Sequence, residues 1–191
     1  MVDQAIAQTP RRPMTARQSA QVERLVRAAI VEIRSSRYTG LTVRKVAARA
    51  GVAPATAYTY FASKDHLIAE AFWRKLQGLP SLEIDHRRGA AARVQSALNE
   101  LTSLLASEPR LAAAVTTAML ADDPDVKHIR DQVGSFIRHR IRSAVGGDKA
   151  AVRAIELAVS GAMIQAGMGH VAYEELPSRL AEVTTLVVKG R

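Results

Sequence analysis

The chain contains 191 residues and no cysteine, so disulfide bonds, thiolate metal sites and cysteine nucleophiles are excluded. Hydrophobic residues make up 48% of the sequence but aromatic residues only 4%, and the abundance of alanine favours helices over sheets. The net charge is +9, and residues 1–75 carry most of it, with 13 Lys and Arg against 5 Asp and Glu. This asymmetry favours a polyanionic partner for the N-terminal part of the chain.

The first residues, 1–14, contain two prolines and the pair Arg11-Arg12, and we interpret them as a flexible basic arm. Such an arm is either a frayed terminus or a segment that enters a minor groove. The prolines also interrupt any signal-peptide core, and no apolar run approaches the roughly 18 residues of a membrane span. We therefore expect a cytoplasmic protein that does not enter the membrane.

Residues 15–77 have the pattern of four helices. Thr15 and Gln18 form a potential capping box, and apolar residues then recur every three or four positions as far as Ile33. Thr42 can cap a short second helix, and Pro54 suits the first position of a third. Ser63 can cap a fourth helix that ends near residue 78.

The remaining residues, 78–191, predict a second helical domain. We expect helices at about 89–107, 109–121, 124–145, 148–171 and 176–189, which are separated by proline and glycine. No segment shows the apolar–polar alternation of a strand. The predicted fold is therefore all-α, with about nine helices.

The segment 41–61 predicts a helix-turn-helix. Ala47 is small where two helices must cross closely, and Gly51 permits the positive φ that reverses the chain. Val52 fills the corner, and Phe61 anchors the pair to its neighbours. In a helix-turn-helix the second helix lies in the major groove of DNA. The alternative is a three-helix bundle with an incidental glycine turn.

Once these core positions are assigned, the other side chains of the third helix are predicted to face outward, with hydroxyl groups that suit phosphates or base edges. Arg44 is expected to point the same way and to bind a guanine or a phosphate. The candidate DNA-binding residues are Thr42, Arg44, Lys45, Ala55, Thr56, Tyr58, Thr59, Tyr60 and Lys64.

This region resembles the TetR family of transcriptional regulators. The resemblance rests on Gly40-Leu41-Thr42-Val43, Val46-Ala47, Ala50-Gly51-Val52, Tyr58-Thr59-Tyr60-Phe61 and Ser63-Lys64-Asp65-His66-Leu67. It implies phosphate contacts by Thr42, Tyr58 and Lys64, and groove contacts by Arg44, Thr56 and Tyr60. Ala53 and Ala55 depart from the common Ser and Gly of the family, which leaves the operator sequence open.

The resemblance also implies a homodimer, a small-molecule pocket in the second domain and repression that the ligand relieves. Large or adaptable apolar groups and one histidine are the pocket candidates, although such residues more often belong to an ordinary core: Trp73, Met119, Phe136, His139, Met163 and Met168. A row of alanines and an apolar stripe on the last helix predict the dimer interface: Ala154, Ala158, Ala162, Leu180, Val183 and Val187.

Other classes of function are less consistent with the sequence. The histidines are scattered without metal-ligand spacing and no serine nucleophile elbow occurs, so no catalytic, metal or cofactor site is expected. The sequence therefore predicts a repressor that a small apolar ligand releases from a palindromic double-stranded DNA operator. A regulator controlled by a protein partner, or an activator, remains an alternative.

Overall fold

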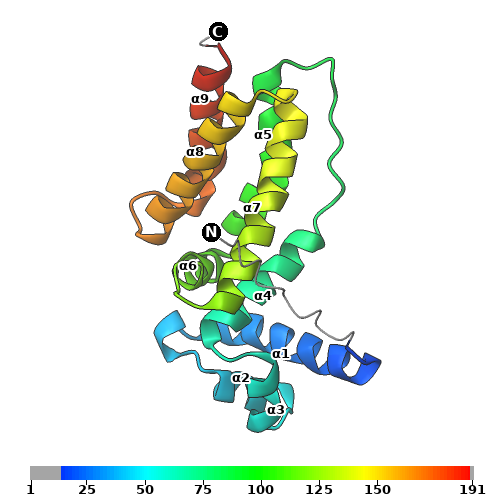
Figure 1. Ribbon diagram of the computed structural model, residues 1–191. Helices are drawn as coiled ribbons and strands as arrows, with labels where there is room; N and C mark the ends of the chain where they lie inside the picture. The colour runs from blue at the N-terminus through cyan, green and yellow to red at the C-terminus, as the bar shows by residue number, and fades with distance from the viewer. Residues whose placement is uncertain (1–13, 190–191) are drawn as a thin grey trace, which may run out of the picture.

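The computed structural model describes residues 14–189, and this part of the chain contains nine α-helices, two short 3-10 helices and no strand (Figure 1). The all-α fold class is thereby confirmed. The predicted arm lies outside the described residues, apart from Met14. None of the described helices is long and apolar enough to cross a membrane.

Four helices and a 3-10 turn form the base of the molecule, as Figure 1 shows. They are α1 (Ala16–Ser35), η1 (Tyr38–Gly40), α2 (Val43–Ala50), α3 (Pro54–Tyr60) and α4 (Lys64–Gln77). Their ends follow from local chemistry. Thr15 and Gln18 form the expected capping box, and Thr42 accepts a hydrogen bond from the Lys45 amide. Gly51 ends α2 with φ of 62°, the left-handed conformation that glycine adopts without steric cost.

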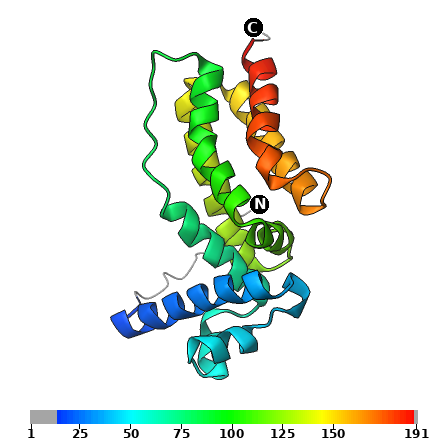
Figure 2. The same ribbon diagram turned by 180° about the vertical axis from the view of Figure 1, so that it is seen from behind.

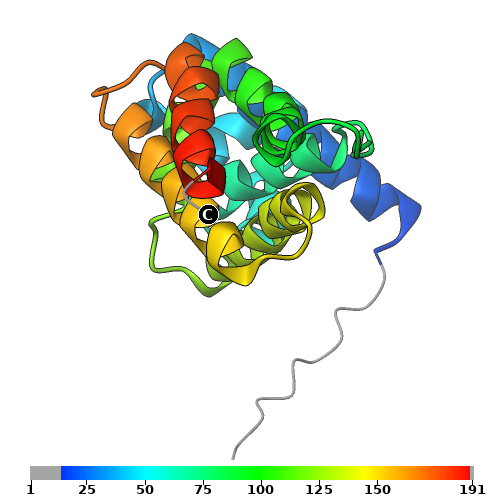
Figure 3. The same ribbon diagram turned by 90° about the horizontal axis from the view of Figure 1, so that it is seen from above.

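The other helices form an elongated bundle above this base, and an extended connection from α4 to α5 follows its outer side (Figure 2). They are α5 (Ala90–Ser107), α6 (Pro109–Ala118), α7 (Pro124–Val145), α8 (Lys149–Gly167), η2 (Tyr173–Glu175) and α9 (Leu176–Lys189). Seen along the long axis, α8 and α9 lie side by side on one flank (Figure 3).

Two helices are shorter than the sequence predicted. The helix expected over 109–121 ends at Ala118, and the one expected over 148–171 ends at Gly167. Gly169, with φ of 79°, leaves the helical conformation shortly after α8, which explains its earlier end. The other predicted helices match the structure to within one or two residues.

The base and the bundle share one continuous apolar core. Helix α4 packs against α1 in the base and against α6 and α7 in the bundle. Its residues Leu67, Ile68 and Leu76 are fully buried between these neighbours. A domain boundary after residue 77 therefore stays a prediction, because α4 belongs to both packing units.

Gly167 provides a stability prediction. A Cβ at Gly167 would lie 2.5 Å from Cγ2 and 2.8 Å from Cβ of Thr116, whereas a Cβ at Gly134 meets no atom within 4 Å. Gly167→Ala should force α6 and α8 apart and lower the free energy of unfolding by about 1–3 kcal/mol in urea titrations. Gly134→Ala should instead raise it by roughly 0.5–1 kcal/mol. An unchanged urea midpoint for Gly167→Ala would contradict the close approach of α8 to Thr116 of α6.

Candidate nucleic-acid interface

The helix α3 lies at the lower end of the molecule, with α1 above it and α2 beside it (Figure 1). Ala57 is fully buried and Phe61 is nearly so, and these two side chains fix α3 to the base. On the opposite side Ala55, Tyr58 and Thr59 are exposed, and Tyr58 shows 50% of its surface. This outer face of α3 is open to a partner along its length.

The start of α2 adds positive charge beside α3. Thr42, Arg44 and Lys45 are all exposed there. The ammonium group of Lys45 donates to the Gly40 carbonyl at 2.8 Å, which holds the lysine at the turn before α2. Arg44 has no such internal bond among the described contacts and extends a guanidinium group that can form a bidentate contact. Together these residues form a basic edge next to the exposed face of α3.

Lys64 is half-buried at the start of α4. Its Nζ donates to the Tyr38 carbonyl at 3.2 Å and lies 4.3 Å from the centroid of the Tyr38 ring. The lysine is therefore held in a fixed position by η1. Thr56, on the adjacent helix, is also half-buried. Both residues border the exposed face of α3 and do not extend fully into solvent.

Tyr60 does not face outward as the sequence analysis predicted. Its side chain is half-buried against the core, and its hydroxyl lies 2.9 Å from Oε1 of Gln21 on α1, to which it donates a hydrogen bond. The physical reason is its place at the end of α3, where the helix meets α1. Tyr60 thus fixes α3 to α1, and Tyr58 is the more accessible of the two tyrosines.

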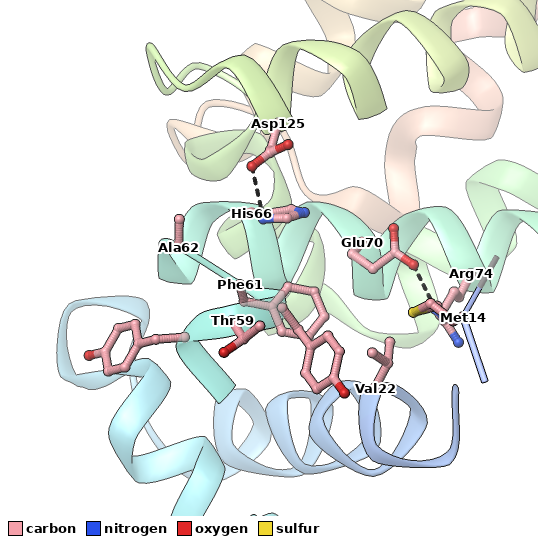
Figure 4. A pocket seen from close by; sticks show the side chains of 11 residues that line it. Met14, Val22, Thr59, Phe61, Ala62, His66, Glu70, Arg74 and Asp125 are labelled. Carbon is pink, nitrogen blue, oxygen red and sulfur yellow. Dashed lines mark hydrogen bonds and ion pairs between the residues drawn. The ribbon is translucent and has the colours of Figure 1, made fainter. Parts of the chain in front are cut away.

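A groove of about 400 Å³ lies where α3 turns into α4, and Figure 4 shows its lining. His66 and Asp125 both line it, and Nδ1 of His66 lies 3.7 Å from the carboxylate of Asp125. Nearby, Ser63 donates a hydrogen bond to Asp123 at 2.7 Å. Burial would raise the pKa of Asp123, but hydrogen bonds from Ser63 and the amides of α7, and the nearby His66, lower it. The start of α4 is thereby joined to the start of α7.

A second polar junction lies at the other end of α4. Glu108, at the start of α6, binds Arg34 of α1 at 2.9 Å and also forms an ion pair with Lys75 of α4. Burial would raise the pKa of Glu108, but the two cations together hold it below its ordinary value. One carboxylate therefore joins three helices from the base and the bundle.

This arrangement predicts a pH-dependent contribution to stability. Because the pKa of Glu108 is lowered in the folded state, its ionised form stabilises the fold above the unfolded pKa, and the contribution is lost as the pH falls below about 4. Glu108→Gln should therefore lower the free energy of unfolding at pH 7 by on the order of 1 kcal/mol. At pH 4 the free energies of unfolding of the variant and the unsubstituted protein, both measured by urea titration, should differ less than at pH 7. The exposed Glu83→Gln serves as the control; a pH-independent difference for Glu108→Gln would contradict the ion pairs.

The bundle contains an apolar cavity of about 270 Å³ between α4, α5, α6, α7 and α8. The predicted pocket residues Met119 and Met163 both line it, together with Phe72 of α4. Its lining also includes Leu101, Val115, Thr116, Leu120, Arg130, Val133, Gly134, Ile137, Val159, Ser160 and Ile164. Most of these side chains are aliphatic, aromatic or thioether groups, which suit an apolar ligand.

The other predicted pocket residues lie elsewhere. The rings of Trp73 and Phe136 pack edge to face with centroids 6.0 Å apart, and with His139 they line an open depression on the outer surface of α4 and α7. Met168 is mostly exposed at the end of α8. Trp73, Phe136, His139 and Met168 therefore do not line the cavity that Met119 and Met163 line, and a ligand contact by these four residues stays a prediction.

The predicted interface residues differ in how exposed they are. Leu180 is buried within its own chain, while Ala158 and Ala162 line a groove toward α9 and Val183 is partly exposed. Ala154 and Val187 are half-buried. A row at every fourth residue advances about 40° around a helix with each step, so the alanine row passes from one face of α8 to another.

The last two helices also carry a more exposed apolar face. Leu157, Ile164 and Met168 on α8 and Leu186 on α9 are large apolar side chains at the surface, and Leu157 and Leu186 are each 74% exposed. The spacing of three and four residues from position 157 through Gly161 to position 168 is a sequence signal for this face.

Comparison with known proteins agrees with the geometry of the base. Residues 21–71 match the family described as bacterial regulatory proteins, tetR family. An HTH-type transcriptional regulator of Mycobacterium tuberculosis (strain ATCC 25618 / H37Rv) is 44% identical over 178 residues, which cover 91% of this chain and 83% of that protein.

Solved structures show the same fold. A TetR transcriptional regulator from Rhodococcus sp. RHA1 superposes with a TM-score of 0.73 at 22% identity, over 90% of this chain and 97% of that one. The regulator FadR from Bacillus subtilis, solved in complex with stearoyl-CoA, gives a TM-score of 0.65 at 21% identity, over 88% and 98% of the two chains.

The helix-turn-helix base under a helical bundle, with these matches, defines a transcriptional regulator of the helix-turn-helix class. The chain belongs to the TetR family of bacterial regulatory proteins. Regulators of this family bind DNA operators and small-molecule ligands, typically as dimers.

Proposed function

We propose that this chain is a cytoplasmic repressor without enzymatic activity, which binds a palindromic operator as a homodimer and is released by a small apolar ligand. The observation that carries the proposal is the exposed face of α3 beside the basic edge of α2. An exposed helix of this kind fits the major groove, and the excess of Lys and Arg in residues 1–75 favours the approach of a polyanion.

The predicted contact residues divide into groove contacts and contacts with the sugar-phosphate backbone. Tyr58, Thr59 and Ala55 face the groove from α3, and Arg44 reaches a guanine or a phosphate from α2. The remaining candidates contact the sugar-phosphate backbone at the rim of the exposed face: Thr42, Lys45, Thr56 and Lys64. Tyr60 positions α3 through its bond to Gln21 and is not assigned a base contact.

The proposed effector occupies the cavity of about 270 Å³ in the bundle. Phe72 and the two methionines supply an apolar wall with adaptable side chains. The structural neighbour FadR, crystallised with stearoyl-CoA, supports a ligand with a substantial apolar part.

The proposed signal passes through α4. Phe72 of α4 lines the cavity, while the first turn of the same helix is joined to α7 and directly follows α3. A ligand that requires more space beside Phe72 shifts α4, and α3 shifts with it. The ligand releases DNA only if it prefers the conformation in which the two copies of α3 no longer match the operator.

Arg44→Ala tests the DNA surface. The substitution should weaken operator binding by about 1–3 kcal/mol, which corresponds to roughly 5- to 150-fold, because it removes a charged contact at the groove. The measurement is fluorescence anisotropy with the operator found by footprinting upstream of the chain's own gene or its neighbours, at several salt concentrations. Arg87→Ala, which removes the same charge from the exposed connection before α5, should change affinity little. An equal loss in both variants would contradict a specific role for Arg44.

Gly134→Leu tests the cavity. The new side chain grows into the space between α7 and α8, where a Cβ at residue 134 meets no atom within 4 Å. Binding of the neutral apolar dye N-phenyl-1-naphthylamine, followed by its fluorescence, should fall at least tenfold. Gly134→Ala should retain the dye. Unaltered dye binding by Gly134→Leu would place the ligand site outside this cavity.

A further inference from the structure

The 3-10 turn η1 holds the two lysines that border the exposed face of α3. Lys45 donates to the carbonyl of Gly40, the last residue of η1. Lys64 donates to the carbonyl of Tyr38, the first residue of η1, at 3.2 Å. The Nζ of Lys64 also lies 4.3 Å from the centroid of the Tyr38 ring. Tyr38 therefore binds one ammonium group with its backbone and its side chain together.

Lys64 occupies a position that is unfavourable for a cation without a partner. It is the first residue of α4, and the free amide groups at a helix N-terminus carry a partial positive charge. The side chain is half-buried, and none of the ion pairs among the described residues includes it. The face of an aromatic ring is negative. The ring and the carbonyl of Tyr38 therefore supply the electrostatic partner that this position lacks.

The contacts with Tyr38 leave Lys64 able to bind a phosphate. An ammonium group has three N–H donors, and the Tyr38 carbonyl accepts one of them. A flexible lysine side chain loses rotational freedom when it binds a partner, and this loss of entropy weakens the contact. Tyr38 restricts the side chain in the free protein, before DNA arrives. Lys64 can thus bind a phosphate with a smaller loss of entropy.

The ring of Tyr38 differs from its hydroxyl group in what it contacts. The hydroxyl is buried and forms no hydrogen bond with the described residues, so it does not hold the ring in place. The ring faces the ammonium of Lys64 and also packs against the apolar core. An ordinary structural role in the base is therefore the competing explanation for Tyr38, and a test must separate the two.

We propose that Tyr38 is a positioning residue of the DNA interface: its ring and its carbonyl hold the Lys64 ammonium in place for a phosphate of the operator. This inference rests on the proposed function, which assigns Lys64 to the sugar-phosphate backbone. It adds that the strength of this contact depends on a residue of η1 that acts through Lys64.

The proposal has a consequence that a structural role does not share. If Tyr38 acts through Lys64, its contribution to operator affinity disappears when the lysine is removed. Two residues that act through one contact give a coupling energy in a double-mutant cycle, whereas independent residues give additive effects. A tyrosine that only stabilised the base would strengthen operator binding equally with and without Lys64.

The test is a double-mutant cycle of Tyr38→Leu and Lys64→Met, measured by fluorescence anisotropy with the operator defined by footprinting. Lys64→Met should weaken binding and reduce the slope of log affinity against log salt by about 1, because one phosphate contact is lost. Tyr38→Leu should weaken binding roughly 2- to 10-fold when Lys64 is present, and less than about twofold in the Lys64→Met background. Tyr38→Phe, which keeps the ring, should retain the affinity. Lys127→Met removes the same charge from an exposed position of α7 and should change neither affinity nor slope.

Fluorination of the ring provides a second measurement in case Tyr38→Leu alters the fold. Phenylalanine and its fluorinated forms, introduced at position 38, differ little in volume, but each fluorine weakens the negative face of the ring. Operator affinity should fall stepwise as fluorine atoms are added, while the helical circular dichroism stays the same. Constant affinity along this series would overturn the electrostatic role of the ring.

The outcomes separate this inference from the proposed function. Unchanged affinity and salt slope for Lys64→Met would overturn the phosphate contact itself and the inference with it. A loss for Lys64→Met without a loss for Tyr38→Leu would overturn the role of Tyr38 and leave the DNA surface as proposed. Additive losses in the cycle would also overturn it, because they assign Tyr38 to the stability of the base. A loss for Tyr38→Leu that disappears in the Lys64→Met background would support the inference.

Discussion

The packing of α4 between the base and the bundle is the constraint on which the rest of the structure depends. Leu67, Ile68 and Leu76 are fully buried between helices from both parts. A packed core changes between discrete arrangements more readily than it deforms continuously, because any void that opens in it loses dispersion contacts. A displacement of α4 is therefore transmitted to α3, which is separated from it by only three residues.

Polar contacts are concentrated at the two ends of this helix. Ser63 joins α4 to Asp123 at one end, and Lys75 joins it to Glu108 at the other. Hydrogen bonds require particular distances and angles, so these contacts add positional constraints at both ends of α4. In the proposed mechanism a ligand beside Phe72 acts on the apolar middle of α4, while the contacts at its two ends limit the positions that α3 can take.

The sequence predicted the features that depend on neighbouring residues. The caps at Thr15, Thr42 and Ser63 and the left-handed Gly51 are local, so the helix starts and the helix-turn-helix could be derived from residue types alone. The orientation of Tyr60 could not, because it depends on Gln21, which is distant in the sequence. The same holds for Glu108, whose partners come from two other helices.

The cavity shows why a list of large apolar residues does not identify a ligand site. Trp73 and Phe136 fill space against each other, so their contacts are already satisfied without a ligand. Met119 and Met163, in contrast, face a space that their own chain leaves empty, and the dispersion contacts missing there are available to a ligand. Sequence reveals the size of a side chain, but only the positions of several helices determine which side chains face an unfilled space. The proposed response to an effector depends on this unfilled space, because a close-packed interior would offer a ligand no room.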